Sequence, residues 1–130
     1  MSEENMEIVR KAIAYEYDGV GDLADAEAIF DAQVVMNPTS EGPSYGPAAM
    51  RADLERWASE FEQLTVTIEE IIDAGDQVVV VAHHQGRGRK SGVEVDTRFY
   101  EVYTVREGKV SRVDEFAERR EALEAAGLSE

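Results

Sequence analysis

Two histidines, His83 and His84, stand side by side in a run of residues that reads as a β-strand. Because successive residues of a strand face opposite sides, at most one imidazole can point inward. Pairing across the Gly-rich turn that follows would set His84 opposite Thr97 and residue 80 opposite Glu101. His84 and Glu101 would then share one face. A histidine with an ordinary pKa of about 6.5 can give or take a proton near neutral pH, so His84 is a candidate acid or base. Two solvated histidines beside a turn are the alternative.

A pair of carboxylates, Asp114 and Glu115, occupies the last predicted strand. The same alternation sends one side chain inward and the other outward. An inward carboxylate within reach of a substrate carbon can act as a general base. A plain surface role for both residues is the alternative.

The aromatic residues fall into two patterned groups. Trp57 and Phe61 are four residues apart on one predicted helical stripe, and Phe99 and Tyr103 share a predicted strand face with Glu101. Such rings form either core or the wall of a pocket. An indole or a phenol offers a flat apolar surface with one polar tip, so a wall of this kind suits a small, largely apolar ligand.

Metal and cofactor sites find no support in the sequence. There is no Cys, which excludes a thiolate zinc site and a cysteine nucleophile. The adjacent His83 and His84 diverge, and no further His exists to complete a site. The Gly-rich run GRGRKSG lacks the GxxxxGK[ST] spacing of a phosphate loop and reads as a hairpin turn. We therefore expect neither a metal nor a cofactor.

Three stretches repeat apolar residues every three or four positions, the period of an amphipathic helix. The first follows a capping Ser2 and stops at Gly19 and Gly21; its apolar residues are Met6, Val9, Ile13 and Tyr17. The second follows a capping Asp22; its apolar residues are Leu23, Ala26, Ile29 and Phe30. The third starts at Pro47; its apolar residues are Met50, Leu54, Trp57 and Phe61. A short strand over residues 33–38 and a loop over residues 39–47, a candidate gate, separate the last two helices.

After Leu64 the apolar period changes to two, which indicates strands. The breaks AGD, GRGRKSG and EGK divide this part of the chain into four strands, and turns this short join only antiparallel neighbours. A final helix over AERREALEAAGL ends at Gly127. Helices first and strands later is the α+β pattern, here a curved antiparallel sheet covered on one face by the N-terminal helices.

The composition fits one domain spanning residues 1–130, with 43% hydrophobic residues. A net charge of −15 repels phosphate backbones and anionic lipid, so neither nucleic acid nor a membrane is an expected partner. The acidity fits either a salt-rich habitat or simple solubility. The acidic N-terminus does not resemble a signal peptide, and no stretch reaches the roughly 18 apolar residues of a membrane span. A cytoplasmic location is the expectation.

This order of elements resembles the nuclear transport factor 2-like superfamily, and within it most closely the SnoaL-like proteins. The resemblance covers nearly the whole chain and rests on Gly46 after Tyr45, DAGDQVVVV, GRGRKSGVEV, and EGKVSRVDEF followed by EALEAAGL. It implies a cone in which the sheet wraps around the helices and leaves a pocket open at one end. It also implies a homodimer through the outer sheet face, which here would carry Tyr100 and Val102.

The steroid isomerases of that superfamily suggest roles for individual positions. Their general-base Asp falls on Asn37, and Asn cannot take a proton at neutral pH, which argues against a dienol-type isomerisation from this position. Their oxyanion-stabilising acid falls on Glu101, and their phenol near Tyr15. A carboxylic acid kept neutral by an apolar pocket can donate a hydrogen bond to a developing oxyanion, whereas a cross-strand ion pair is the alternative for Glu101. The inward acid of the last strand falls on Glu115.

Three functions follow from the resemblance. The first is binding of a small apolar molecule with one or two oxygens. The second is a cofactor-free acid–base enzyme, such as an isomerase, a polyketide cyclase or an epoxide hydrolase, with Glu115 or His84 as proton acceptor and Glu101 as oxyanion donor. The third is a module that only dimerises. An upward shift of the pKa of Glu101 or Glu115 would favour the enzyme.

Overall fold

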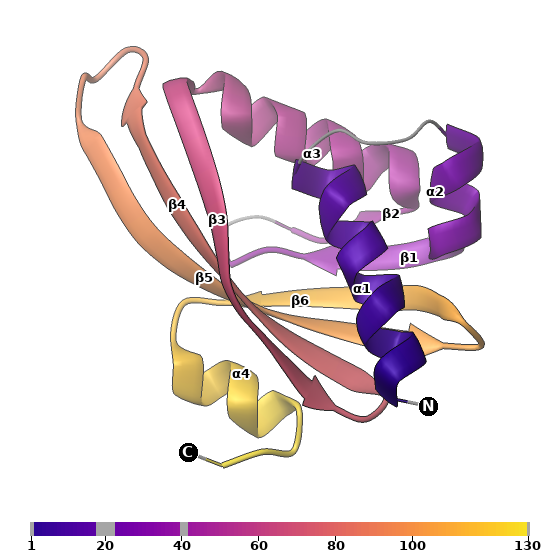
Figure 1. Cartoon of the computed structure of the whole chain (residues 1–130). Coiled ribbons are helices and arrows are strands. Elements are labelled where there is room, and N and C mark those ends of the chain that lie inside the picture. Colours follow the sequence, from indigo (N-terminus) through magenta and orange to yellow (C-terminus); the bar gives the residue numbers. More distant parts are fainter. Residues whose placement is uncertain (1, 18–22, 40–41, 130) are drawn as a thin grey trace.

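The computed structural model describes residues 2–17, 23–39 and 42–129. Three helices, α1 (Ser2–Tyr17), α2 (Leu23–Ile29) and α3 (Pro47–Ser59), lie on one side of a curved sheet, and α4 (Arg119–Ala125) lies on the other (Figure 1). The predicted α+β class and the curved sheet around N-terminal helices are confirmed. The predicted stop and cap signals at Gly19, Gly21 and Asp22 fall outside the described residues, and so does the capping side chain of Ser2.

Four long strands form the predicted antiparallel meander. They are β3 (Phe61–Ala74), β4 (Gln77–Gly88), β5 (Glu94–Arg106) and β6 (Lys109–Phe116). Two further strands extend the sheet: β1 (Phe30–Asn37) pairs parallel with β6, and β2 (Ser44–Tyr45) pairs antiparallel with β1. The sheet is therefore six-stranded and mixed, with the order β2-β1-β6-β5-β4-β3.

Two predicted element ends are wrong by a few residues. Phe30 begins β1 instead of closing the second helix, and Phe61 begins β3 instead of continuing the third. Both rings are buried, so the apolar requirement that the helical period detected is met from a strand. The residues after each Phe favour extended backbone, because Val34 and Val35 follow the first and Thr65 to Thr67 follow the second.

The main core lies between the helices and the concave face of the sheet. Its largest members with almost no exposure are Val9, Phe30, Val34, Met50, Val78, Val80, Tyr103, Val110 and Val113. In β4 the even-numbered residues face this core, and the odd-numbered ones face the opposite side. This alternation decides which chemistry-bearing side chains enter the concave side.

The convex face of the sheet is half covered by α4. Ala122, Leu123 and Ala126 of this segment pack on Val79 and Val102, which are fully buried. The expectation that Val102 forms an uncovered apolar dimer surface is therefore wrong, because the C-terminal helix of the same chain covers it. None of the described helices combines the length and apolarity needed to cross a bilayer.

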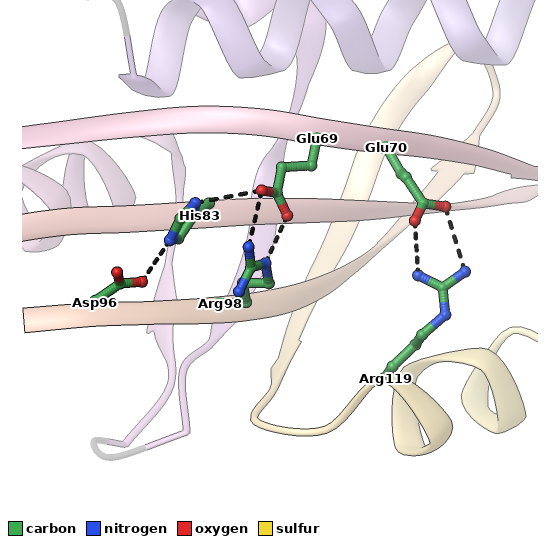
Figure 2. A network of polar contacts seen from close by, with 6 residues as sticks. All are labelled: Glu69, Glu70, His83, Asp96, Arg98 and Arg119. Atoms are coloured by element: carbon green, nitrogen blue, oxygen red, sulfur yellow. Dashed lines mark hydrogen bonds and ion pairs between the residues drawn. The ribbon is translucent and has the colours of Figure 1, made fainter.

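The other half of the convex face is polar (Figure 2). Glu69 binds Arg98 through two contacts of 2.6 and 3.1 Å, and His83 lies between Glu69 and Asp96. A β-bulge interrupts β3 between Ile68 and Glu70. Glu69, at this bulge, has no cross-strand partner. Both glutamates consequently reach the convex side.

Glu70 forms an ion pair with a residue of α4. Its carboxylate accepts hydrogen bonds of 3.0 and 3.3 Å from the guanidinium of Arg119 (Figure 2). The pair links the edge of the polar half to the helix that covers the apolar half.

Candidate functional site

A small cavity opens on the concave side, between α3, the end of β1, and strands β4 to β6. It encloses about 70 Å³, and most of its wall is apolar. The lining residues are Tyr17, Met36, Pro38, Asp53, Leu54, Trp57, His84, Phe99 and Glu115. We refer to this cavity as the pocket.

A phenol and a carboxyl group are paired beside the pocket. The hydroxyl of Tyr17, at the C-terminal end of α1, donates to Oε2 of Glu101 on β5 over 2.7 Å. Glu101 is 1% exposed, and its Oε1 has no hydrogen-bond partner among the described residues. Burial, reinforced by the charge of Glu16, raises the pKa of Glu101 well above its ordinary value. Burial therefore favours the protonated form of the carboxyl group that pairs with Tyr17.

A second carboxyl–phenol pair, partly buried, lies next to the first. The hydroxyl of Tyr103 donates to Oε2 of Glu16, the residue before Tyr17. Oε1 of Glu16 has no partner among residues 2–17, 23–39 and 42–129. Burial raises the pKa of Glu16 to about 8, and the hydrogen bond from Tyr103 opposes that shift only in part. Glu16 is therefore also mostly protonated at neutral pH.

His84 enters the pocket from β4, and His83 leaves it. The predicted register is confirmed, with His84 opposite Thr97 and Val80 opposite Glu101. Trp57 donates its indole N–H to Nδ1 of His84 over 3.2 Å, and burial lowers the pKa of His84 to about 4. A neutral imidazole whose Nδ1 accepts must carry its proton on Nε2. His84 is therefore suited to donate a hydrogen bond and poorly suited to accept a proton.

Aromatic rings surround His84 at nearly right angles. The ring of Phe99 lies 4.9 Å from the imidazole at 89°, and that of Tyr17 lies 5.8 Å away at 82°. Trp57 in turn packs edge-on against Phe61 at 4.8 Å. The wall of the pocket is therefore mostly apolar, which favours an apolar ring or chain as its ligand.

Glu115 brings a carboxylate to the pocket from β6. As predicted, Glu115 lines the pocket, whereas Asp114 lies on the convex side and binds Arg112 and Asn37. The backbone N–H and the hydroxyl of Thr39 both donate to Oε1 of Glu115, over 3.1 and 3.3 Å. Thr39 belongs to the segment predicted to gate the pocket, so one end of that segment is bonded to a pocket residue.

Three residues expected at the ligand lie elsewhere. Tyr15 packs against Phe30 in the core, with Arg51 over its ring. Asn37 faces the convex side, because its neighbours Met36 and Pro38 face the pocket and a strand alternates. Phe61 supports Trp57 from behind and does not line the pocket.

Among the other expected residues, Trp57 and Phe99 line the pocket, and Tyr103 serves the second carboxyl pair. The sequence reasoning missed Glu16, Tyr17 and Leu54 as site residues. For Tyr17 and Leu54 the signal was present in the helical period, since both belong to the inward stripes, whereas Glu16 gave none. No cluster of His, Asp and Glu side chains suited to a metal ion occurs in the described part of the chain.

The family model for the SnoaL-like domain matches residues 13–113. The chain belongs to the SnoaL-like domain family. This match contains every residue of the pocket wall except Glu115, and it confirms the resemblance suggested by the sequence. A comparison with curated proteins finds no match.

Solved structures confirm the fold of this SnoaL-like chain. A nuclear transport factor 2-like protein from Burkholderia xenovorans LB400 is 26% identical, with 97% of each chain covered and a TM-score of 0.74. A protein from Jannaschia sp. CCS1 with the provisional name SnoaL-like polyketide cyclase is 22% identical, with 88% of this chain and 85% of that one covered and a TM-score of 0.74. TerC, co-crystallised with polyporic acid, is 19% identical, with 95% and 98% covered and a TM-score of 0.70.

Proposed function

We propose that this SnoaL-like protein binds a small, mostly apolar molecule through an oxygen atom that faces Tyr17. The observation that carries the proposal is the Tyr17–Glu101 pair, a phenol and a buried carboxyl group 2.7 Å apart beside an apolar pocket. The polyporic acid complex of TerC, a structural neighbour, supports an oxygenated ligand.

The pair can serve a ligand oxygen by reversing its hydrogen bond. Without ligand, Tyr17 donates to Glu101. A protonated Glu101 can instead donate to the phenol oxygen, which frees the Tyr17 proton for a ligand carbonyl or oxyanion. In an apolar environment the hydrogen bond from Glu101 to Tyr17 strengthens the hydrogen bond from Tyr17 to the ligand. An anionic ligand oxygen is therefore bound more strongly than a neutral one.

An acid–base enzyme without a cofactor is the second candidate, and the position of Glu115 favours it. Glu115 lines the same pocket as Tyr17 and is the cross-strand partner of Glu101. A base and an oxyanion donor that both face one ligand are the parts needed to remove a proton next to a carbonyl group. Isomerisation and aldol cyclisation need this step, and epoxide opening needs related acid–base chemistry.

A phenol titration tests the binding proposal. We expect substituted phenols to bind with an affinity that rises as the phenol becomes more acidic, because oxyanion character strengthens the bond from Tyr17. Tyr17→Phe should weaken binding about tenfold, the effect of losing one hydrogen bond of roughly 1.4 kcal/mol. Tyr45→Phe is the matched control, since Tyr45 is 64% exposed and does not line the pocket. Equal affinity for Tyr17→Phe and the wild type would contradict the proposal.

Proton exchange tests the enzyme. In D₂O, nuclear magnetic resonance would follow loss of the α-proton of a small cyclic ketone such as 2-cyclohexenone. We expect the wild type to accelerate exchange and Glu115→Gln to abolish the acceleration. Ligand binding without any acceleration of proton exchange would support the binding function and contradict the enzymatic one.

A homodimer through the outer sheet face is part of the same proposal. Because α4 covers Val102, the surface available for it is the polar half around Glu69, His83 and Arg98. Sedimentation velocity should show a dimer whose dissociation is favoured by salt, since charged contacts are screened. Arg98→Glu should shift the dimer to monomer.

A further inference from the structure

A second cavity lies beside the pocket and is larger. This groove, between α1, α3 and β3, encloses about 340 Å³. Its lining residues are Glu16, Tyr17, Leu54, Trp57, Ala58, Leu64, Thr65, Val66 and His84. Four of them, namely Tyr17, Leu54, Trp57 and His84, also line the pocket. These four side chains therefore lie between the two cavities, and we refer to them as the partition.

The partition depends on α3. Leu54 and Trp57 come from this helix, and Trp57 is held by one hydrogen bond of 3.2 Å to His84 and by ring contacts with Phe61 and Phe99. The indole is only partly buried. A cavity of about 70 Å³ is small for a ring-sized ligand, whereas the pocket and the groove together offer much more room.

The polar atoms near the partition that lack partners among the described residues are Oε1 of Glu16, Nε2 of His84 and Oε1 of Glu101. Each is a hydrogen-bond donor by elimination. Trp57 occupies Nδ1 of His84, which leaves the proton on Nε2. Tyr17 and Tyr103 donate to Oε2 of Glu101 and of Glu16, so a buried, neutral carboxyl group carries its proton on Oε1.

Buried donors without partners are costly, and a ligand with acceptor oxygens removes that cost. We propose that the pocket and the groove form one elongated ligand site divided by Trp57, in which Glu16 donates a hydrogen bond to a second acceptor oxygen of the ligand. The ligand class is an apolar carbonyl compound about two rings long, with one oxygen at Tyr17 and another on the groove side. This inference rests on the proposed function of Tyr17.

An amine would need a different state of the same residue. A ligand ammonium group in the groove would require Glu16 to be ionised, although this residue lies in an apolar environment and its nearest partner is a phenol. Leu54, Ala58, Leu64 and Val66 form an apolar part of the groove wall and disfavour that charge pair. Tight binding of a simple amine is therefore an outcome that contradicts the proposal.

Two matched probes separate the halves of the site. 4-Hydroxybenzophenone and 4-benzylphenol have the same two rings and the same phenol, and they differ in a carbonyl group against a methylene. Isothermal titration calorimetry would measure both probes on the wild type, Glu16→Leu, Glu16→Gln and Tyr17→Phe. We expect Glu16→Leu to weaken the ketone about tenfold and to leave 4-benzylphenol unchanged. Glu16→Gln, whose amide still donates, should recover most of the ketone affinity.

Each result separates this inference from the proposed function. If Glu16→Leu weakens both probes equally or neither, the second oxygen site is wrong even where Tyr17→Phe weakens both. If Tyr17→Phe changes nothing while Glu16→Leu discriminates between the probes, the groove site stands and the role of Tyr17 fails. Tighter binding of benzylamine than of either phenol would overturn the acceptor class. Circular dichroism would confirm that each variant is folded.

Discussion

Glu101 and Glu115 face each other across β5 and β6 as cross-strand partners, yet their surroundings differ. Glu101 is buried against the hydroxyl of Tyr17, whereas Glu115 is partly exposed and bonded to Thr39. Burial raises the pKa of Glu101 well above its ordinary value, whereas Glu115 accepts hydrogen bonds from the backbone N–H and the hydroxyl of Thr39. This difference is what a site with one proton donor and one proton acceptor requires.

Removing the Tyr17 hydroxyl should cost stability as well as binding. In Tyr17→Phe the buried carboxyl group of Glu101 loses its only hydrogen bond within the described residues. We expect a decrease of about 1–2 kcal/mol in the free energy of unfolding, measured by urea denaturation at neutral pH. The exposed Tyr45 again provides the control, since Tyr45→Phe should change stability by less than about 0.5 kcal/mol. Equal losses in the two variants would show that the bond to Glu101 contributes nothing.

Glu16 should make the wild type less stable at alkaline pH. Its pKa in the folded protein is about 8 against an ordinary value of 4.5, so the folded state holds a proton that the unfolded state has released. Its contribution is complete below about pH 4.5 and is lost as the pH rises toward 8. Within that range the free energy of unfolding should fall by about 1.4 kcal/mol per pH unit for this one acid.

Glu16→Gln tests this pH dependence. Urea denaturation between pH 6.5, at the upper end of the range in which His84 affects stability, and pH 8 should give a shallower slope for the variant than for the wild type. The buried Glu101 also has a raised pKa, so a residual slope of the same sign should remain. Parallel curves for the two proteins would exclude a raised pKa at Glu16.

Trp57 should report the protonation of His84. Trp57 is the single tryptophan of the chain, and its indole N–H donates to the imidazole. Protonation of Nδ1 breaks that hydrogen bond and places a cation beside the indole. We expect a change in tryptophan fluorescence with a midpoint near pH 4 and no change near pH 6.5. His84→Phe should remove the transition, and a midpoint near pH 6.5 would contradict the buried position of His84.

The same shift of His84 acts on stability with the opposite sign from Glu16. A folded pKa of about 4 against an ordinary 6.5 means that the unfolded state takes up the proton first. Stability from this residue is therefore present above pH 6.5 and is lost as the pH falls toward 4. His84→Phe should flatten that acid side of the stability curve.

The C-terminal helix should be held by burial and not by its ion pair. Leu123 is 5% exposed against Val79 and Val102, whereas Arg119 and Glu70 pair at the surface with side chains 37% and 48% exposed. Leu123→Ala should cost about 2–4 kcal/mol in thermal or urea unfolding, and Arg119→Ala should cost less than about 1 kcal/mol. The reverse order would mean that electrostatics fixes α4.

Most of the fold could be predicted from apolar spacing and turn chemistry. The three short breaks between strands define the meander, and the period of two sets the register that places His84 on the same face of the sheet as Glu101. The parallel pairing of β1 with β6 could not be predicted in this way, because it joins segments far apart in the sequence and no turn records it. Nor does the short sequence of α4 indicate which face of the sheet it covers.

The candidate site was predictable in its strands and less so in its helices. The inward positions of Glu101 and Glu115 follow from the alternation of a strand, because each side chain faces one side of the sheet or the other. On a helix, a shift of two residues turns a side chain by about 200°, so Tyr15 enters the core while Tyr17 reaches Glu101. Glu16 was missed because an acid beside two tyrosines gives no sequence signal of burial; only the fold brings Tyr103 to it.

The bulge at Glu69 determines which side chains in the first half of β3 face the concave side of the sheet. This single extra residue separates the part of the strand before Ile68 from the part that starts at Glu70. If Glu69 were instead paired with Ala82, the earlier segment would slide by one position relative to β4, so Leu64 and Val66 would leave the groove wall and Thr67 would turn toward it. Leaving this one residue unpaired thereby decides whether that part of the ligand side is lined mainly with hydrocarbon or with hydroxyl groups.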